Sequence, residues 1–391
     1  SVGGSWNIYK EKFFQADFVD MLKLRSSYGI GGNIGRNTAP YLIASYYDSS
    51  LVDGMAGSVN TPPNKDIRWE KTTTVNVGVD FALFRHRLSG TIEYYNKYSV
   101  DLLAAINGSP TQGFGYTTLM TNNGKMVNRG VEITLSGEII RQKDFSWNAS
   151  LLYAFNRNKV KHISVQPSLW DSRISMPTSY PMVGKPLYGI YAYKWAGLNE
   201  NGDPQVYDAE NNVTSGPARD YHALVYCGTT VPIHNASLTN VLRYKGFEFS
   251  AMLILDAGHK LRSSNIPSIN MSNGRITSTA KGIVDRWTQP GDVTDVPRLL
   301  FSNDTENFNT HRTELYRYSD LFVYDASNIR LSNISLAYRV PAHWCKKISL
   351  SGARLQFNVE NVATFAFDSK ANYDLGGKVK PNYVWGLYLN F

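Results

Sequence analysis

Apolar and polar residues alternate in short runs along most of the chain. In residues 74–83, valine, phenylalanine and leucine at every second position alternate with polar or small residues. Side chains of a β-strand point to opposite faces in turn, so this period of two predicts strands with one apolar and one polar face. The predicted strands cover residues 22–30, 74–83, 88–95, 131–139, 145–155, 238–243, 247–255, 329–340, 353–363 and 383–391, with one more near Ser5. The alternation slips near Asn333, where we predict a β-bulge.

The last of these runs is the reference from which the faces and directions of the other strands are assigned. Its apolar face carries Tyr383, Trp385, Leu387, Leu389 and Phe391. An edge strand of this kind invites pairing with other chains, and soluble proteins avoid leaving one exposed. We therefore expect the strand to pair on both sides, as it would in a closed barrel.

The runs are long for a water-soluble protein. Most extend over about 10 to 15 residues, whereas strands of globular proteins average about 5 or 6 and a tilted membrane strand needs about 9 to 11. A polar row opposite an apolar row fits a barrel that meets lipid outside and water inside. A β-sandwich also alternates, but with shorter strands and more even loops. The pattern favours an all-β fold, a transmembrane antiparallel β-barrel.

The connections between the runs alternate in length. Tight connections fall at residues 83–88, 140–145, 243–247 and 340–348, and long ones at 104–125, 164–231, 256–322 and 364–380. Outer-membrane barrels have short periplasmic turns and long extracellular loops in the same alternation. Counting back from the last strand gives about eleven strands, an odd number that indicates an incomplete sheet. An open sheet would expose unpaired backbone groups to lipid, so we expect the chain to be part of a longer protein whose upstream residues supply the missing strands.

Two of the long connections contain structure of their own. Residues 186–195 and 197–204 resemble a strand followed by a turn. The alternation of the rims allows either no or two membrane crossings in this connection, and we favour an extracellular hairpin. Residues 278–288 predict a short helix that ends before Pro290. Loops of this length are uncommon unless they are functional.

Composition adds little to this fold assignment and excludes several functions. The 391 residues contain no signal peptide at the start and no apolar run of the ~18 residues that a membrane helix needs. Aromatic residues make up 13% of the chain, with 25 tyrosines, which is typical of β-rich and membrane-interface proteins. The net charge of +8 is spread along the chain, so it indicates solubility and loop charge, and we expect no nucleic-acid partner.

No residue pattern indicates catalysis, a cofactor or a metal. The seven histidines are scattered, and Cys227 and Cys345 lie too far apart for a metal or redox motif. Residues 199–203 resemble a calcium loop only in composition. Glu93, Glu132 and Glu138 fall on polar strand faces, where a solvated barrel wall explains them better than a pair of catalytic carboxylates. We predict that the protein is not an enzyme.

Aromatic residues in the predicted outer loops are the candidate ligand contacts. Aromatic rings stack on the apolar faces of sugars and also pack against peptides. The candidates are Tyr116, Trp170, Tyr180, Tyr188 and Trp287, each of which could instead be structural. A second group, of basic residues at the tight turns, either contacts anionic headgroups of the inner leaflet or serves solubility. This group comprises Arg85, Arg87, Arg141, Lys143, Lys245, Lys346 and Lys347.

Several motifs, in order along the chain, resemble a known family. They lie at residues 22–29, 67–74, 76–80, 87–96, 128–132, 193–198, 244–247 and 325–336. Together they resemble the C-terminal half of SusC-like (SusC/RagA) TonB-dependent transporters, outer-membrane proteins of Bacteroidetes that import glycans or peptides. The resemblance implies a 22-stranded barrel with a plug domain and a TonB box that interacts with TonB. It also implies a SusD-like surface lipoprotein as a lid. Residues 1–391 would be the C-terminal part of the barrel, with the plug and the TonB box upstream.

The end of the chain resembles a β-signal, the stretch that the barrel-assembly machinery reads. The residues that carry this resemblance are Gly386, Leu389 and Phe391. Backbone pairing with the machinery and two lipid-facing side chains would provide the recognition. The alternative is an ordinary last strand that happens to end in phenylalanine.

The predicted function is active import of a glycan or peptide nutrient across the outer membrane, without a cofactor. Two alternatives stay open at this point. One is a secreted β-rich hydrolase that acts on glycans, and the other is a surface or adhesive barrel that transports nothing. Which nutrient is carried does not follow from the sequence, because loop aromatics suit glycans and peptides alike.

Overall fold

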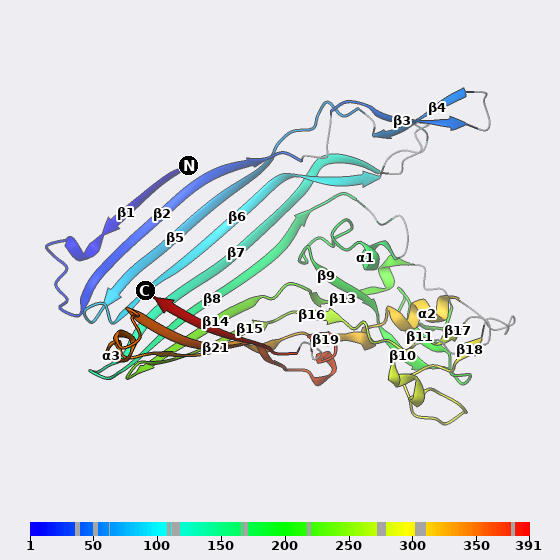
Figure 1. The fold of residues 1–391 in the computed structure, drawn as a ribbon. Coiled ribbons are helices and arrows are strands. Elements are labelled where there is room, and N and C mark those ends of the chain that lie inside the picture. The colour runs from blue at the N-terminus through cyan, green and yellow to red at the C-terminus, as the bar shows by residue number, and fades with distance from the viewer. Residues whose placement is uncertain are drawn as a thin grey trace.

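In a computed structural model of the chain, eleven strands form one antiparallel sheet (Figure 1). The described residues are 1–35, 40–49, 54–61, 63–107, 111, 118–165, 167, 171–216, 220–271, 279–301, 310–376 and 380–391. In spatial order the strands are β1 (Val2–Asn7), β2 (Val19–Asn33), β5 (Glu70–Leu83), β6 (Leu88–Asn107), β7 (Thr118–Arg141), β8 (Phe145–His162), β14 (His234–Tyr244), β15 (Phe247–Ala257), β20 (Asn328–Arg339), β21 (Gly352–Ala366) and β22 (Asn382–Asn390). The predicted all-β class and the count of about eleven strands are confirmed.

The register gives the sheet two different faces. On one face Val79 lies opposite Ile92, which lies opposite Ile133, and we call this the apolar face. On the other face Gly78 lies opposite Glu93, which lies opposite Glu132, and we call this the polar face. Large side chains of the apolar face are open to the surroundings, among them Ile92, which is 44% exposed. Contiguous exposed apolar area of this kind marks a surface that contacts lipid or a partner.

The bulge predicted near Asn333 is present. The register of β20 against β15 shifts between the pairs Asn333–Met252 and Leu331–Leu253, and the same shift occurs against β21. One extra residue in a strand turns the side chains that follow to the other face. The bulge therefore keeps both Leu331 and Ile334 on the apolar face.

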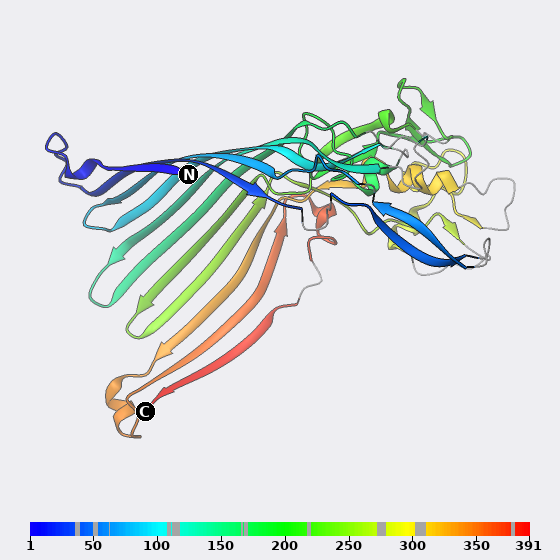
Figure 2. The same cartoon turned by 90° about the horizontal axis from the view of Figure 1, so that it is seen from above.

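Tight and long connections leave the sheet at opposite ends, as predicted (Figure 2). At the end with tight turns, the turn rim, Lys245 and Gly246 join β14 to β15 with φ values of 44° and 93°. Two successive positive φ values match the twist of the paired strands, which explains the glycine at the second position. The other connections of this rim include η1 (Ile8–Lys10) and α3 (Ala342–Lys346), the latter within residues 340–351.

One predicted long connection is wrong. Residues 104–125 do not form a loop throughout, because β6 continues to Asn107 and β7 begins at Thr118, and the two strands stay paired to these ends. The register shifts between Ser99 and Leu102, where Asp101 has a φ of 56°. Alternation of apolar and polar residues is lost beyond this bulge, so the period of two could not reveal the extension. A second hairpin that the pattern missed, β3 (Ile43–Ser49) with β4 (Gly54–Thr61), lies at the same end.

The end of the sheet opposite the turn rim is called the loop rim here. The other long connections fold there into a separate layer, the loop assembly (Figure 1). Its elements are α1 (Ser172–Ser175), β9 (Gly189–Tyr193), β10 (Trp195–Leu198), β11 (Pro204–Tyr207), β12 (Val213–Thr214), η3 (Tyr221–Ala223), β13 (Leu224–Thr229), β16 (Lys260–Arg262), β17 (Asn270–Met271), η4 (Lys281–Asp285), β18 (Leu300–Phe301), α2 (Thr310–Arg317), η5 (Asp320–Phe322), β19 (Val323–Asp325) and η6 (Ser369–Ala371). None of these strands joins the eleven-stranded sheet, in agreement with the favoured extracellular hairpin in residues 164–231. The helix predicted in residues 278–288 is the short 3₁₀-helix η4.

Among the described residues, both clusters of buried hydrophobic side chains lie in the loop assembly. Tyr191, Tyr193 and Leu315 are at most 2% exposed and form one cluster with neighbouring apolar residues. A second cluster contains Ile269 and Tyr316. Within the described residues, no helix is both long and apolar enough to cross a bilayer.

Candidate functional site

The polar face carries a connected network of charged side chains. The guanidinium of Arg25 donates to Asp80 over 3.2 Å and to Glu93 over 2.5 Å, and Asn76 also donates to Glu93. Thr91 donates to Asp80 over 3.0 Å. These side chains come from β2, β5 and β6, so the network links three neighbouring strands across the face.

A glycine makes room for this network. A Cβ built on Gly78 would lie 2.9 Å from Cζ of Arg25, because the guanidinium rests on the glycine. Farther along the sheet Arg330 and Asn235 both donate to Asp256, each over 2.7 Å. Asp80, Glu93 and Asp256 are thus paired with cations and amides, as expected for a wall that faces water. Among the described residues, no group of three histidine, cysteine or acidic side chains is arranged to hold a metal ion.

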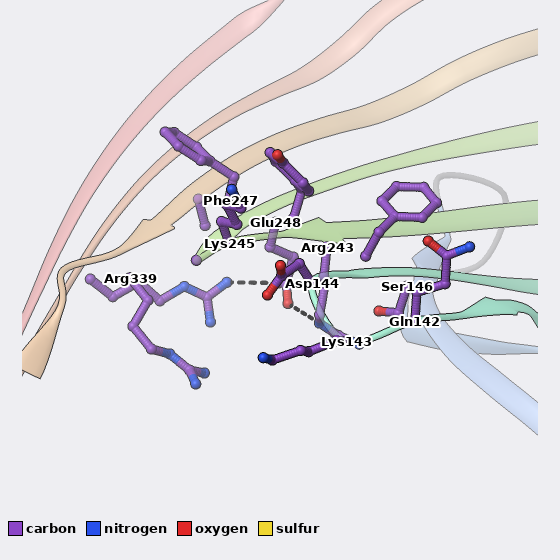
Figure 3. Close-up of a pocket in the computed structure, with 14 residues that line it drawn as sticks. Gln142, Lys143, Asp144, Ser146, Arg243, Lys245, Phe247, Glu248 and Arg339 are labelled. Atoms are coloured by element: carbon purple, nitrogen blue, oxygen red, sulfur yellow. Dashed lines mark hydrogen bonds and ion pairs between the residues drawn. The ribbon is translucent and has the colours of Figure 1, made fainter.

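A basic pocket opens where the polar face meets the turn rim (Figure 3). Its volume is about 260 Å³, and five cations and two carboxylates line it. These charged residues are Lys143, Arg243, Lys245, Arg339 and Arg354, with Asp144 and Glu248. Glu248 accepts from Arg243 over 2.7 Å and from Arg354 over 3.1 Å. The excess of positive charge makes this pocket suited to an anionic group. Two of the turn residues that the sequence analysis singled out, Lys143 and Lys245, belong to it.

Three of the five predicted ligand contacts, Tyr180, Tyr188 and Trp287, fall within the described residues. Tyr180 is 7% exposed, and its backbone carbonyl accepts from the buried Arg173, so its ring belongs to the interior of the loop assembly. Tyr188 directly precedes β9 and is 50% exposed. Tyr116 and Trp170 lie outside the described residues. The role of these residues in ligand binding stays a prediction.

Trp287 lines an open cavity of about 690 Å³ in the loop assembly. Its half-buried ring lies against Gly202, where an added Cβ would come within 2.4 Å of the ring. Gly202 has a φ of 73°, so the turn between β10 and β11 needs a glycine there for both reasons. The other side of the cavity is formed by residues 290–294. A cavity with one aromatic wall and polar edges can hold a sugar ring or a short peptide segment.

A buried ion cluster that the sequence analysis missed fixes this region. Asp203 accepts from Arg298 over 2.8 Å and from Arg312 over 2.6 Å. Arg312 is 3% exposed and also donates to Asn270 and to the carbonyl of Arg298. Burial lowers the pKa of Arg312, and the charge of Asp203 opposes this effect. The cluster joins segments about a hundred residues apart, so no local motif could have indicated it.

The residues of the predicted assembly signal lie in or next to β22. Leu389 falls on the apolar face with Trp385, whose ring centroid is 4.2 Å from that of Phe357. Gly386 falls on the polar face, where the ring of Tyr388 lies within 3.0 Å of the place of an added Cβ. Phe391 follows the strand and is 91% exposed. Their role in assembly stays a prediction.

Comparisons with known proteins give one consistent answer. The model of the family described as "TonB dependent receptor-like, beta-barrel" matches residues 1–362. The TonB-dependent receptor P3 of Formosa agariphila is 26% identical over 98% of the chain, and the match covers 39% of that receptor. The TonB-dependent receptor SusC of Bacteroides thetaiotaomicron is 26% identical over 92% of the chain, and the match covers 36% of that receptor.

A solved structure shares the fold along the whole chain. The structure of the RagAB peptide transporter superposes with a TM-score of 0.78 at 23% sequence identity. The match covers 100% of this chain and 43% of the other one. The chain therefore spans well under half the length of the relatives that it matches.

Proposed function

The chain belongs to the family of TonB-dependent receptor-like β-barrels, and on that premise we propose that it forms about half of the barrel wall of a nutrient importer. Proteins of this family lie in the outer membrane and are not enzymes, so the alternative of a secreted hydrolase does not fit. The observation that carries the proposal is the sheet itself, with one apolar face, one paired polar face and loops and turns at opposite rims. These are the properties of a wall between lipid and water.

Upstream residues of the same protein would complete the barrel. The edge strands β1 and β22 would pair with strands from that part, which would bring the total to about 22 and leave no backbone edge in lipid. The upstream part would also provide a plug that closes the lumen and a TonB box through which TonB supplies energy. The polar face would line the lumen, and the basic pocket would open at its periplasmic end.

The cargo we propose is a glycan or a peptide, captured at the loop rim together with a SusD-like surface lipoprotein. The cavity beside Trp287 supports this proposal, since it is open, partly aromatic and held in shape by the cluster around Asp203. The RagAB peptide transporter is among the proteins that the chain resembles, which supports a peptide, and the aromatic wall of the cavity suits a sugar ring equally well.

Uptake by the full-length protein tests the proposal. A strain that lacks the gene would receive wild type, Trp287→Ala or Trp344→Ala, and uptake of labelled oligosaccharides and oligopeptides would be measured with and without TonB. Trp344 is a matched control, because it is 55% exposed at the turn rim. We expect TonB-dependent uptake of one cargo class, with an apparent KM about tenfold higher for Trp287→Ala, since one aromatic contact contributes about 1.4 kcal/mol. Uptake that persists without TonB contradicts a TonB-driven importer, and no uptake of either class favours an adhesive barrel.

We propose that Gly386, Leu389 and Phe391 serve as the assembly signal. The support is that Leu389 faces the apolar side of an edge strand whose backbone can pair with the assembly machinery. Phe391→Ala in the full-length protein should slow the appearance of the heat-resistant folded form, while the adjacent Asn390→Ala should not. Equal rates for the two variants would remove Phe391 from the signal.

A further inference from the structure

A group of basic side chains lies on the apolar face where the apolar rows end. On β7 the apolar row of Leu135, Ile133 and Val131 is followed by Arg129, toward the loop rim. On β8 the apolar row ends at Phe155 and is followed by Arg157. Lys159 comes next on the same face of β8, opposite Val127. All three basic side chains are exposed.

The register places the two arginines directly opposite each other. Arg129 pairs with Arg157 within an unbroken run of pairs between β7 and β8. Directly opposed like charges destabilise an antiparallel pair, because the Cβ atoms are only about 4.5–5.5 Å apart. Within the part of the chain that the structure describes, neither arginine forms an ion pair with a carboxylate. A counter-charge between the two guanidinium groups would remove this repulsion.

One of the guanidinium groups is already oriented. Nε of Arg129 donates over 3.0 Å to Asn96, which lies opposite it on β6. The terminal nitrogens of Arg129 therefore stay available for a second acceptor. The neighbouring positions of the apolar face on β5 and β6, from Lys71 to Val75 and from Asn96 to Val100, include no carboxylate.

The surroundings identify the anion that fits. Tyr94 and Tyr98 flank Asn96 on the same face of β6, 44% and 40% exposed, as tyrosines do at the boundary between lipid tails and headgroups. If the loop rim is extracellular, this boundary belongs to the outer leaflet. We infer that Arg129, Arg157 and Lys159 form a clasp for a phosphate group of an outer-leaflet glycolipid. Arginine suits this task, since its planar fork binds phosphate oxygens in pairs.

The clasp is a binding site for lipid and not for cargo, because it lies on the opposite face from the lumen wall. It depends on the orientation of the chain in the outer membrane, but not on what the barrel carries. A bound glycolipid would neutralise the arginine pair and anchor the outer end of the β7–β8 pair.

Lipid retention by the full-length protein tests the clasp. The protein would be purified from outer membranes in a mild detergent, and bound lipids would be identified and counted by native mass spectrometry. The test variant is Arg129→Gln with Arg157→Gln. The control is Lys97→Gln with Lys23→Gln, which removes the same charge from the polar face, where Lys97 lies over the ring of Tyr95. Heat-modifiability would verify that all variants are folded.

We expect wild type and control to retain a phosphorylated glycolipid and the test variant to retain roughly tenfold less, since each basic residue near a membrane surface adds to the attraction for anionic lipid. Re-addition of glycolipid should restore binding, whereas glycolipid whose phosphates have been removed should not. If the double variant fails to assemble, Arg157→Gln alone should still reduce retention, because Arg129 keeps its bond to Asn96. Equal retention by test and control variants, equal binding of the dephosphorylated lipid, or occupation by inorganic phosphate alone would overturn the inference.

Discussion

A charge introduced on the apolar face should destabilise the barrel far more than one on the polar face. Ile92 lies at the middle of the apolar row of β6, with Gly90 and Tyr94 on either side along the strand and Val79 and Ile133 opposite it. Its side chain is 44% exposed on the side that we assign to lipid. An arginine near the bilayer midplane of a β-barrel costs about 2–4 kcal/mol. Each 1.4 kcal/mol is about a factor of ten in an equilibrium constant, so Ile92→Arg should shift the folding equilibrium by roughly 30-fold to 1000-fold.

The neighbouring residue provides the matched variant. Thr91 lies on the polar face and donates to Asp80 over 3.0 Å, so an arginine at position 91 would have a carboxylate partner and water. Both variants would be made in the full-length protein and folded into lipid bilayers. Urea unfolding, followed by tryptophan fluorescence and heat-modifiability, gives the free energy of unfolding of each. We expect a loss of at least about 2 kcal/mol for Ile92→Arg and less than about 1 kcal/mol for Thr91→Arg. Equal losses, or a larger loss for Thr91→Arg, would refute the assignment of the faces.

Three further changes test other parts of the structure. Asp203→Ala leaves the buried Arg312 without its carboxylate and should destabilise the loop assembly by about 3–5 kcal/mol, measured as faster proteolysis of the loops in an intact barrel. Gly130→Ala should cost about 1–3 kcal/mol of barrel stability in urea, because the new Cβ would lie 2.4 Å from the ring of Tyr95 and 2.5 Å from a backbone carbonyl. Burial raises the pKa of Asp325, but hydrogen bonds from Ser327 and Lys260 outweigh burial and lower this pKa to about 2. The ionised carboxylate of Asp325 therefore stabilises the fold fully above about pH 4, which is the pKa of an aspartate in the unfolded chain. This contribution is lost as the pH falls toward 2. Asp325→Asn should flatten the acid dependence of loop proteolysis in that range.

Each of these changes has a control or an opposite outcome. Gly31 is also in a strand, but an added Cβ there would meet nothing within 4 Å, so Gly31→Ala should be neutral. Unchanged proteolysis of Asp203→Ala would mean that the cluster does not hold the loops together. A variant Asp325→Asn with the full acid dependence of wild type would place the titrating group elsewhere.

The strands and their faces could be predicted from the sequence because the environment of a membrane wall repeats every second residue. The bulge near Asn333 was visible for the same reason, since it interrupts the alternation of Leu331 and Ile334. The alternation of apolar and polar residues did not reveal the part of β6 that reaches Asn107. Where a strand extends beyond the lipid, both of its faces are in water, so nothing favours apolar residues on one face. The alternation also failed to show the β3–β4 hairpin.

The loop assembly was harder to predict for a different reason. Its stability comes from contacts between distant segments, such as the bond between Arg312 and Asp203 and the burial of Tyr193 beside Leu315. Neither has a local signature in the sequence. Of the loop aromatics, Trp287 lies at a cavity and Tyr180 lies in the interior, a difference that composition alone could not reveal.

The central claim is that one face of the sheet contacts lipid, and a spin-label scan along β15 tests it most directly. Single labels at positions 248–256 of the full-length protein in lipid bilayers would be measured for collisions with dissolved oxygen, which concentrates in the hydrocarbon. We expect the collision rate to alternate with a period of two, with maxima at Phe249, Ala251 and Leu253 and minima at Glu248, Ser250 and Met252. A flat profile, or maxima at the positions of the polar face, would contradict it.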